Sequence, residues 1–229
     1  MNPPGALVIF VKTPGLSPVK SRLAQEVGQK LSREFYERSV RATEAVAREA
    51  QSRCPGLAVY WAVAEVEGLA APMWAGFPKL YQGEGSLGLR LSHVYQQILQ
   101  RHAFACFMGA DSPHLEVSKL IHGIRETARW LREKFVMGEA DDGGFYFFGG
   151  SIPVPETDWT SVPYSVSQTA QELSLRLELI APVCKIERSF DIDLLDDLKH
   201  YLASQTLAPE LLPEQLDLIQ WSREVCKDR

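Results

Sequence analysis

A single carboxylate follows a short apolar segment near the middle of the chain. Residues 105–108 read Ala-Cys-Phe-Met, and residues 109–113 then read Gly-Ala-Asp-Ser-Pro, with the acid at Asp111. Such a segment is typical of a buried strand, and in open α/β sheets ligands bind beyond the carboxyl ends of strands. Asp111 could therefore bind a metal ion or a ribose. The alternative is a helix cap, with Pro113 at the first position of the next helix.

A second pair of acids, Asp191 and Asp193, follows a late apolar segment at residues 183–186. Acids at a helix start can simply complement the helix dipole. They can also supply oxygen ligands, since Mg²⁺ takes one or two carboxylates and completes its shell with water and substrate phosphates. Asp111 with Asp193, or with Asp191, meets that requirement if the fold brings the two turns together.

A basic loop follows the first apolar segment, residues 6–11. It carries Lys12, Lys20 and Arg22, with Pro14 and a second proline between them. A polyphosphate needs such charges, and arginine adds a planar fork that matches phosphate oxygens. The prolines stiffen the loop, so little ordering entropy is left to lose on binding. We expect phosphate binding here; the alternative is a solvated loop without function.

Residues 83–88 match the pattern Gly-x-Gly-x-x-Gly, from Gly83 to Gly88. Asp111 lies at about the distance downstream that a ribose-binding acid has in dinucleotide-binding proteins. Glu84, however, would put a carboxylate beside the pyrophosphate, and the preceding strand is short and poorly apolar. We favour the alternative, a helix entry whose glycines allow tight turns.

The segment Ala-Asp-Asp-Gly-Gly at residues 140–144 separates two apolar segments. Asp-Gly in that setting is a hairpin signal. The functional interpretation is that Gly143 and Gly144 let the backbone approach a ligand while Asp142 contacts it. Both interpretations stay open on the sequence alone.

These residues need a scaffold of alternating strands and helices. Strands are expected at residues 6–11, 57–64, 79–81, 105–108, 135–138, 145–148 and 183–186, and helices at 31–50, 87–101, 115–133, 165–177 and 191–202, with a last amphipathic helix after residue 213. Residues 151–164 are expected to form a surface loop. The alternation predicts an α/β fold whose mostly parallel central sheet has helices on both faces.

The 229 residues, of which 45% are hydrophobic, suit one large domain over residues 1–203 with a C-terminal helical extension at 204–229. A net charge of -5 argues against a nucleic-acid surface. No apolar stretch approaches the ~20 residues that cross a bilayer, and the N-terminus does not have the pattern of a signal peptide. The four cysteines form no Cys-x-x-Cys pair, which favours free thiols in the cytoplasm. Histidine spacing fits no metalloprotease, and His114 is expected to be exposed at a helix start.

Taken in order, these segments resemble a family of bacterial GT-A-type glycosyltransferases, or nucleotide-diphospho-sugar transferases, of unknown substrate. More distantly they resemble molybdenum-cofactor and phospholactate guanylyltransferases. The matching motifs run from the first strand to about residue 198: Lys12-Thr13-Pro14 with Lys20-Ser21-Arg22-Leu23, Gln82 with Leu87-Gly88-Leu89-Arg90-Leu91, Gly109 to Pro113, Ala140 to Gly144, Trp159-Thr160, and Asp191 to Asp197.

The resemblance implies a single-domain GT-A fold with a nucleotide-binding N-terminal half. It implies Mg²⁺ or Mn²⁺ on Asp111, Asp191 and Asp193, and catalytic roles for Lys20, Asp111 and Asp142. Nucleotide contacts are expected from Lys12, Pro14, Lys20, Arg22, Gln82, Gly83 and Gly88, and acceptor contacts from Asp142, Gly143, Gly144 and Trp159.

Three functions follow as hypotheses. The first is a metal-dependent transferase that takes a nucleoside-diphosphate sugar as donor and a small molecule as acceptor. The second is a nucleotidyltransferase that joins a nucleoside triphosphate to a small phosphorylated substrate and releases pyrophosphate. The third is a nucleotide-binding protein without turnover. All three imply a nucleotide partner and neither nucleic acid nor a membrane span.

Overall fold

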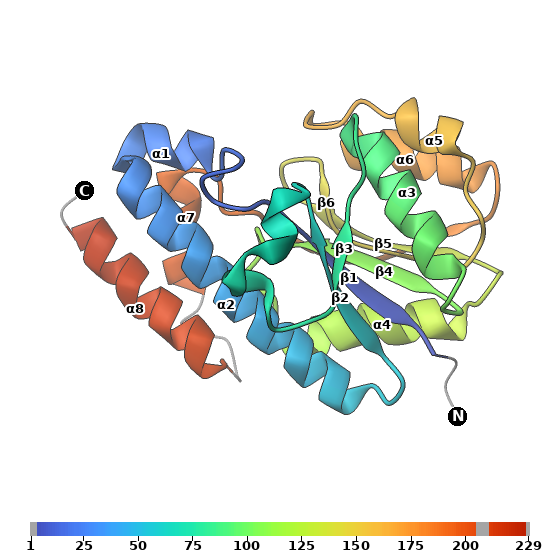
Figure 1. Cartoon of the computed structure of the whole chain (residues 1–229), viewed down its shortest axis with the longest axis horizontal. Helices are drawn as coiled ribbons and strands as arrows, with labels where there is room; N and C mark the ends of the chain where they lie inside the picture. Colours follow the sequence, from blue (N-terminus) through green and yellow to red (C-terminus); the bar gives the residue numbers. More distant parts are fainter. Residues whose placement is uncertain (1–3, 205–210, 228–229) are drawn as a thin grey trace.

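One seven-stranded sheet forms the centre of the protein, with strand order β3-β2-β1-β4-β6-β5-β7 (Figure 1). The computed structural model describes residues 4–204 and 211–227. Strand β6 is antiparallel to its neighbours β4 and β5, and the other pairings are parallel, so the predicted mostly parallel α/β sheet is confirmed. The strands are β1 (Ala6–Val11), β2 (Ala58–Val63), β3 (Lys79–Tyr81), β4 (Ala105–Gly109), β5 (Phe135–Ala140), β6 (Phe145–Gly150) and β7 (Val183–Ser189).

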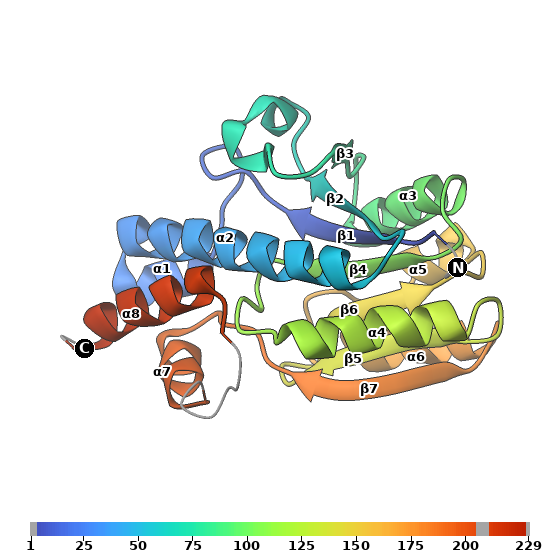
Figure 2. The same cartoon turned by 90° about the horizontal axis from the view of Figure 1, so that it is seen from below.

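Helices cover both faces of the sheet (Figure 2). Their bounds are α1 (Ser21–Val27), α2 (Gln29–Arg53), α3 (Leu87–Leu99), α4 (Val117–Arg129), α5 (Glu156–Thr160), α6 (Thr169–Glu178), α7 (Leu195–Ser204) and α8 (Pro213–Lys227), with short 3₁₀ helices η1 (Glu67–Ala70) and η2 (Pro72–Trp74). Helices α2 and α4 pack on one face, and α3, α5 and α6 on the other. None of the helices in the described ranges has the length and apolar character that crossing a bilayer requires.

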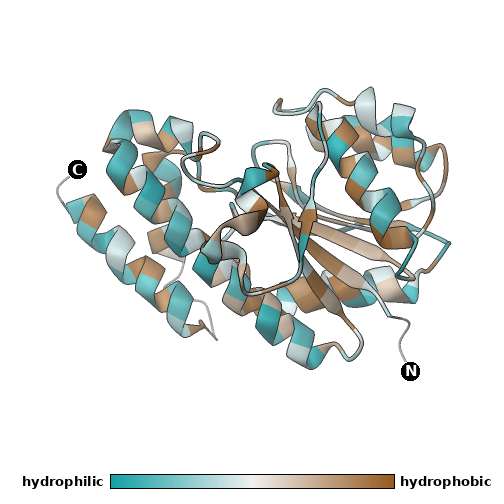
Figure 3. Ribbon diagram, in the orientation of Figure 1, coloured by the Kyte–Doolittle hydropathy of each residue, from teal (hydrophilic) through white to brown (hydrophobic). Residues whose placement is uncertain are grey.

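Strand β1 shows why its sequence is apolar at every position. Leu7 and Ile9 join the core cluster beneath α2 and α4, while Ala6 and Val8 join the cluster beneath α3 and α6. A central strand buried on both faces has no solvent side, so it does not alternate. Figure 3 shows apolar residues along the central strands and hydrophilic ones on the outer helix surfaces.

A third cluster lies beyond the carboxyl ends of β1 and β7, where α1, α7 and α8 pack against the start of α2. Phe35 of α2 and Leu218 of α8 meet there around Ile192, which is 0% exposed. The C-terminal extension predicted at 204–229 contains α8, while its residues 205–210 and 228–229 lie outside the described part of the chain. The acidic turn around Ile192 therefore rests on the C-terminal helix.

Two local predictions were wrong. The helix expected at 115–133 spans only Val117–Arg129, and Pro113 is not its first residue, because residues 112–115 form a turn in which the Leu115 amide donates to the Ser112 carbonyl (3.1 Å). Residues 151–164 are not merely a surface loop, since they contain α5, whose Trp159 is 0% exposed. The hairpin signal at 140–144 is confirmed: β5 and β6 pair there.

Gly88, on the first turn of α3, sets how closely α3 approaches α5. A Cβ atom at this position would lie 2.5 Å from the Trp159 carbonyl oxygen and 3.0 Å from the Thr160 Cα. Both are backbone atoms, so the helices would have to move apart. Gly88 therefore has a packing role, and the nucleotide contact predicted for it remains a prediction.

We expect Gly88→Ala to destabilise the protein by about 1–2 kcal/mol, because the backbone clash outweighs the better helix propensity of alanine. Urea unfolding monitored by circular dichroism measures this. The matched control is Gly109→Ala, whose Cβ would meet nothing closer than 3.7 Å. Equal stability of the two variants would contradict this account of α3 packing.

Candidate active site

The basic loop and both acidic turns meet beyond the carboxyl end of the sheet. Lys20 Nζ lies 2.7 Å from Asp111 Oδ1 and 2.9 Å from Asp193 Oδ1. It also donates to the Ile192 carbonyl oxygen (2.7 Å). The chain after β7 reaches back to the end of β4, where the Ile192 amide donates to the Asp111 carbonyl (3.3 Å). The sequence placed these groups in three separate loops, and the fold brings them to one point.

Lys20 and Asp193 perturb one another's ionisation. Burial would lower the pKa of Lys20, but the charges of Asp111 and Asp193 outweigh it and raise that pKa above its ordinary value. Burial opposes ionisation of Asp193, yet the Lys20 ammonium lowers its pKa below the usual range. Lys20 and Asp193 therefore stay charged across the neutral range.

Asp111 does not cap a helix. The helix that follows starts at Val117 with Glu116 as its cap residue, and the Asp111 carboxylate, 52% exposed, pairs with Lys20 instead. The capping alternative for Asp111 is therefore wrong.

Asp191 has a different environment from the other two acids. It is partly buried, and its Oδ1 accepts a hydrogen bond from Ser112 Oγ (2.7 Å). Burial, followed by the charge of Asp111, raises the pKa of Asp191 to about 7. Within residues 4–204 and 211–227, no three His, Cys, Asp or Glu side chains are arranged to hold a metal. The two solvent-reaching carboxylates, Asp111 and Asp193, offer the hard oxygen donors that Mg²⁺ or Mn²⁺ prefers.

The loop that carries the cations is held at its start. Tyr36 Oη accepts from the Lys12 amide (3.0 Å) and donates to the Lys12 carbonyl (2.8 Å). The Lys12 side chain is exposed. Arg22 is 64% exposed, with Nη1 3.7 Å from Asp193 Oδ2. Lys12 and Arg22 thus remain accessible to an anion, whereas Lys20 is engaged by carboxylates.

Glu65 is an acid beside the basic loop that the sequence reasoning did not single out. It follows β2, and its Oε2 accepts from the Thr13 amide (2.9 Å), while Oε1 is buried without a hydrogen-bond partner. A buried acceptor without a partner is costly, so Glu65 is held in this position by its bond to the loop rather than by a second bond at Oε1. The signal was available, since an acid after an apolar strand is the same pattern that identified Asp111.

The glutamine-led segment has structural roles. Gln82 is 4% exposed, and its amide nitrogen donates to the carbonyls of Val11 (3.1 Å) and Ala62 (2.8 Å). It thereby ties together the ends of β1 and β2. Gly83 turns with a φ of 88°, a conformation that favours glycine. The nucleotide contacts predicted for Gln82 and Gly83 remain predictions.

The residues predicted to contact the acceptor do not all point toward the ion cluster. Asp142 is exposed, accepts from the Gly144 amide (2.8 Å), and lies close enough to Asp191 to raise its pKa. Gly143 lies against Ser167, just before α6, and its carbonyl accepts from the Ala170 amide in the first turn of α6 (2.9 Å). The Trp159 ring lies in the core against the rings of Phe148 and Tyr95. The acceptor roles remain predictions, and Trp159 has its side chain away from solvent.

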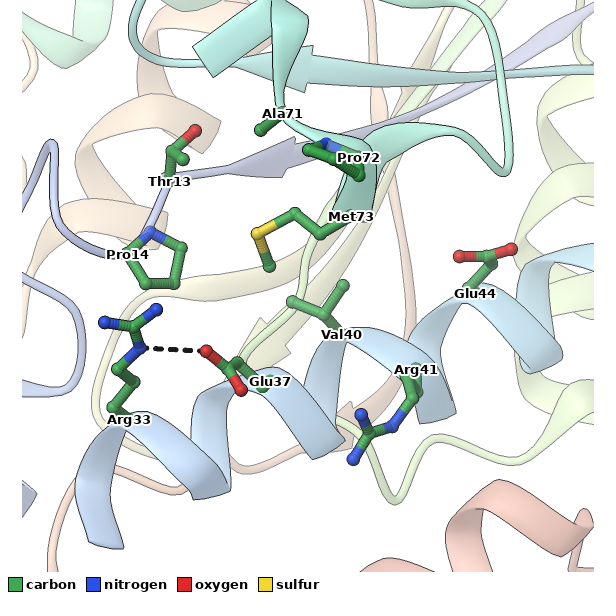
Figure 4. A pocket seen from close by; sticks show the side chains of 10 residues that line it. All are labelled: Thr13, Pro14, Arg33, Glu37, Val40, Arg41, Glu44, Ala71, Pro72 and Met73. Carbon is green, nitrogen blue, oxygen red and sulfur yellow. Dashed lines mark hydrogen bonds and ion pairs between the residues drawn. The ribbon is translucent and has the colours of Figure 1, made fainter. Parts of the chain in front are cut away.

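A cavity of about 480 Å³ lies next to the loop, between α2 and η2. Figure 4 shows Pro14, Val40 and Met73 around it, with the Arg33–Glu37 ion pair (2.9 Å) at its edge. None of the predicted metal ligands lines this cavity. It borders the loop without containing the carboxylate cluster.

The fold is shared with several solved structures. The structure of a "putative nucleotide-diphospho-sugar transferase" from Desulfovibrio desulfuricans G20 is similar over 99% of this chain and 98% of that chain, with 17% identity and a TM-score of 0.84. A nucleotidyl transferase from Methanothermobacter aligns over 87% and 98%, with 12% identity and a TM-score of 0.54. A manganese complex of Rv0371c from Mycobacterium tuberculosis aligns over 87% and 98%, with 16% identity and a TM-score of 0.51. The predicted GT-A-type fold is confirmed.

The chain belongs to the family described as "Uncharacterized protein conserved in bacteria (DUF2064)", whose model matches residues 45–166. That span includes Asp111 and Asp142 and excludes the basic loop and the Asp191/Asp193 turn. No curated protein matches this sequence. The family description names no activity, so the substrate has to be argued from the site.

His114 is buried, contrary to the prediction of an exposed histidine. It is 7% exposed, stacks on Phe190 with ring centroids 3.9 Å apart, and lies with Nε2 3.0 Å from Ser189 Oγ. Burial, followed by the charges of Lys119 and other nearby cations, lowers the pKa of His114 to about 3. The imidazole is therefore neutral in the folded protein at any pH near neutrality.

This shift predicts a loss of stability in acid. Below the ordinary pKa of 6.5 the unfolded chain binds a proton at His114 that the folded protein does not, so stability present above pH 6.5 is lost as the pH falls toward 3. When the pH falls from 7.5 to 5, we expect the free energy of unfolding of the wild type to decrease by about 2 kcal/mol more than that of His114→Gln. Urea unfolding at both pH values measures this, with exposed His93→Gln as control. If the free energy of unfolding decreases equally in the wild type and in His114→Gln, the conclusion that His114 is buried as a neutral imidazole is wrong.

Proposed function

We propose that this protein is a metal-dependent transferase that takes a nucleoside-diphosphate sugar as its donor. The observation that carries the proposal is the meeting of Lys20, Asp111 and Asp193 at the carboxyl edge of a sheet with the transferase fold. In such an arrangement the carboxylates can hold a divalent cation, and a diphosphate can bind both that cation and the positively charged side chains. The exposed Lys12 and Arg22 extend the positive side of the site.

In this proposal Lys12, Lys20 and Arg22 bind the diphosphate oxygens and stabilise the charge that develops when the diphosphate leaves. Asp111 and Asp193 would hold Mg²⁺ or Mn²⁺, which supplies Lewis-acid stabilisation of the leaving diphosphate. The bond from the sugar carbon to the diphosphate breaks, and a bond to the acceptor oxygen forms. Asp142 is exposed near the cluster and is proposed to take the acceptor proton.

Nucleotidyl transfer is the second candidate, and the likeness to a nucleotidyl transferase of the same fold favours it. A substrate phosphate would attack the α-phosphorus of a nucleoside triphosphate, and pyrophosphate would leave with its charge stabilised by the same cations. The two reactions share the loop and the carboxylates. They differ in the product released.

We expect a nucleoside-diphosphate sugar at about a hundred times its Kd, together with Mn²⁺, to raise the Tm by about 5–10 °C. A thermal-shift panel of sugar nucleotides and nucleoside triphosphates, with and without Mg²⁺ or Mn²⁺, measures this. Asp111→Asn should remove the metal-dependent part of the shift. The control Asp196→Asn, at a side chain that is 91% exposed, should keep it.

Analysis of the products separates the two reactions. Release of a nucleoside diphosphate with acceptor modification supports glycosyl transfer, whereas pyrophosphate release from a triphosphate supports nucleotidyl transfer. If no nucleotide shifts the Tm in the presence of either metal, both transferase proposals are wrong.

A further inference from the structure

The Lys20 ammonium occupies the point between the two carboxylates proposed as metal ligands. Three oxygens surround Nζ: Asp111 Oδ1 at 2.7 Å, Asp193 Oδ1 at 2.9 Å and the Ile192 carbonyl oxygen at 2.7 Å. An ammonium has three N–H donors, so these oxygens use all of them. The Lys20 side chain is 2% exposed. Lys20 therefore has no donor left for a phosphate while it stays in this position.

A divalent cation cannot share this point with the ammonium. Asp111 Oδ1 and Asp193 Oδ1 both face Nζ, so a divalent cation held by these two carboxylates would need the space that the ammonium fills. Like charges so close together repel strongly in a partly buried site. Either the lysine or the metal ion can bridge these two oxygens at one time.

Release of the ammonium involves the side chain alone. The Lys20 backbone is left-handed, with φ 46° and ψ 45°, a conformation that lysine rarely adopts. It is held because the Lys20 carbonyl accepts from Ser32 Oγ (2.8 Å) and from the Ala24 amide (2.9 Å). The flexible four-carbon stem can then swing from a fixed base.

The chemistry of the exchange favours one form of ligand. A free divalent cation would replace the ammonium on the carboxylates but leave Lys20 without anionic partners. A free diphosphate would offer oxygens to Lys20 but leave Asp111 and Asp193 as two adjacent unpaired carboxylates. A diphosphate that carries its own divalent cation supplies a new partner to each side, so both sets of charges stay neutralised.

We propose that Lys20 is a tethered counter-ion that excludes free divalent cations from Asp111 and Asp193, so that the site takes its metal as a metal–diphosphate chelate. This inference rests on the metal ligands proposed above and adds the form in which the metal arrives. Asp111 and Asp193 can bind a metal ion only in the molecules whose Lys20 has left them. The apparent affinity for free metal is therefore the intrinsic affinity multiplied by the fraction of such molecules.

Titration with Mn²⁺ alone tests the inference without any nucleotide. We expect Lys20→Met to bind Mn²⁺ about tenfold or more tightly than wild type, measured by calorimetry and by the EPR signal of free Mn²⁺. The matched control is Lys12→Met, which removes a positive charge from the same loop but leaves the carboxylates paired with Lys20. Its Mn²⁺ affinity should change much less. Equal affinities of folded Lys20→Met and wild type would overturn the inference.

A measurement on wild type covers the case in which Lys20→Met does not fold. Reductive methylation followed by peptide mass spectrometry should find Lys20 protected both without ligands and in the presence of Mn²⁺ alone, because the free ion does not displace the ammonium from the carboxylates. Exposed Lys12 serves as the internal reference for reagent activity. Modification of Lys20 in the presence of Mn²⁺ alone would contradict the inference, because it would show that the free ion displaces the ammonium. If no nucleotide binds but Lys20→Met still gains Mn²⁺ affinity, the tethered counter-ion stands and the proposed transferase does not.

Discussion

The ion cluster around Lys20 is the interaction on which the functional end of the molecule depends. One ammonium joins the loop after β1, the turn after β4 and the turn after β7. Strands β4 and β7 are not neighbours in the sheet, because β6 and β5 lie between them. Two carboxylates this close would repel one another without a cation. The lysine therefore both assembles the site and neutralises it.

The surrounding structure holds this cluster through backbone contacts. Ser32 and Tyr36 of α2 bond to backbone atoms at the two ends of the basic loop. Ile192 lies between the two acids of the late turn and is 0% exposed in the third cluster. The charged side chains can thus exchange partners while their backbones remain fixed, which is the usual requirement for a preorganised site.

The fold could be predicted from the sequence because its signals are local. The apolar run of β1 and the Asp-Gly hairpin between β5 and β6 each reflect short-range chemistry that the structure repeats. The strand order was not predictable in this way, since the antiparallel insertion of β6 between β4 and β5 depends on long-range pairing. The start of α4 was misjudged because Pro113 suits a turn as well as a first helical position.

The candidate site was predictable in its parts but not in its pairing. Asp111 and the cations were found because each follows a strand end. Lys20 binds carboxylates because the chain after β7 returns to the end of β4. The spacing of residues in the sequence does not reveal that return, so the sequence suggested a lysine free to bind phosphate. The burial of individual side chains was also not predictable from the sequence. His114 and Trp159 look polar or loop-borne in the sequence, yet both lie inside the packed structure.

The packing of α8 on the start of α2 has a consequence for how the molecule comes apart. Ile192 shares its cluster with Leu218 of α8 and Phe35 of α2. Local opening of that cluster releases the turn that carries Asp193 without breaking any strand pairing of the central sheet. Hydrogen exchange in proteins proceeds through such sub-global openings. The backbone amides of the late acidic turn should therefore show the same protection from hydrogen exchange as those of the C-terminal helix. The ion pairs of the Lys20 cluster should break before the strands of the sheet separate.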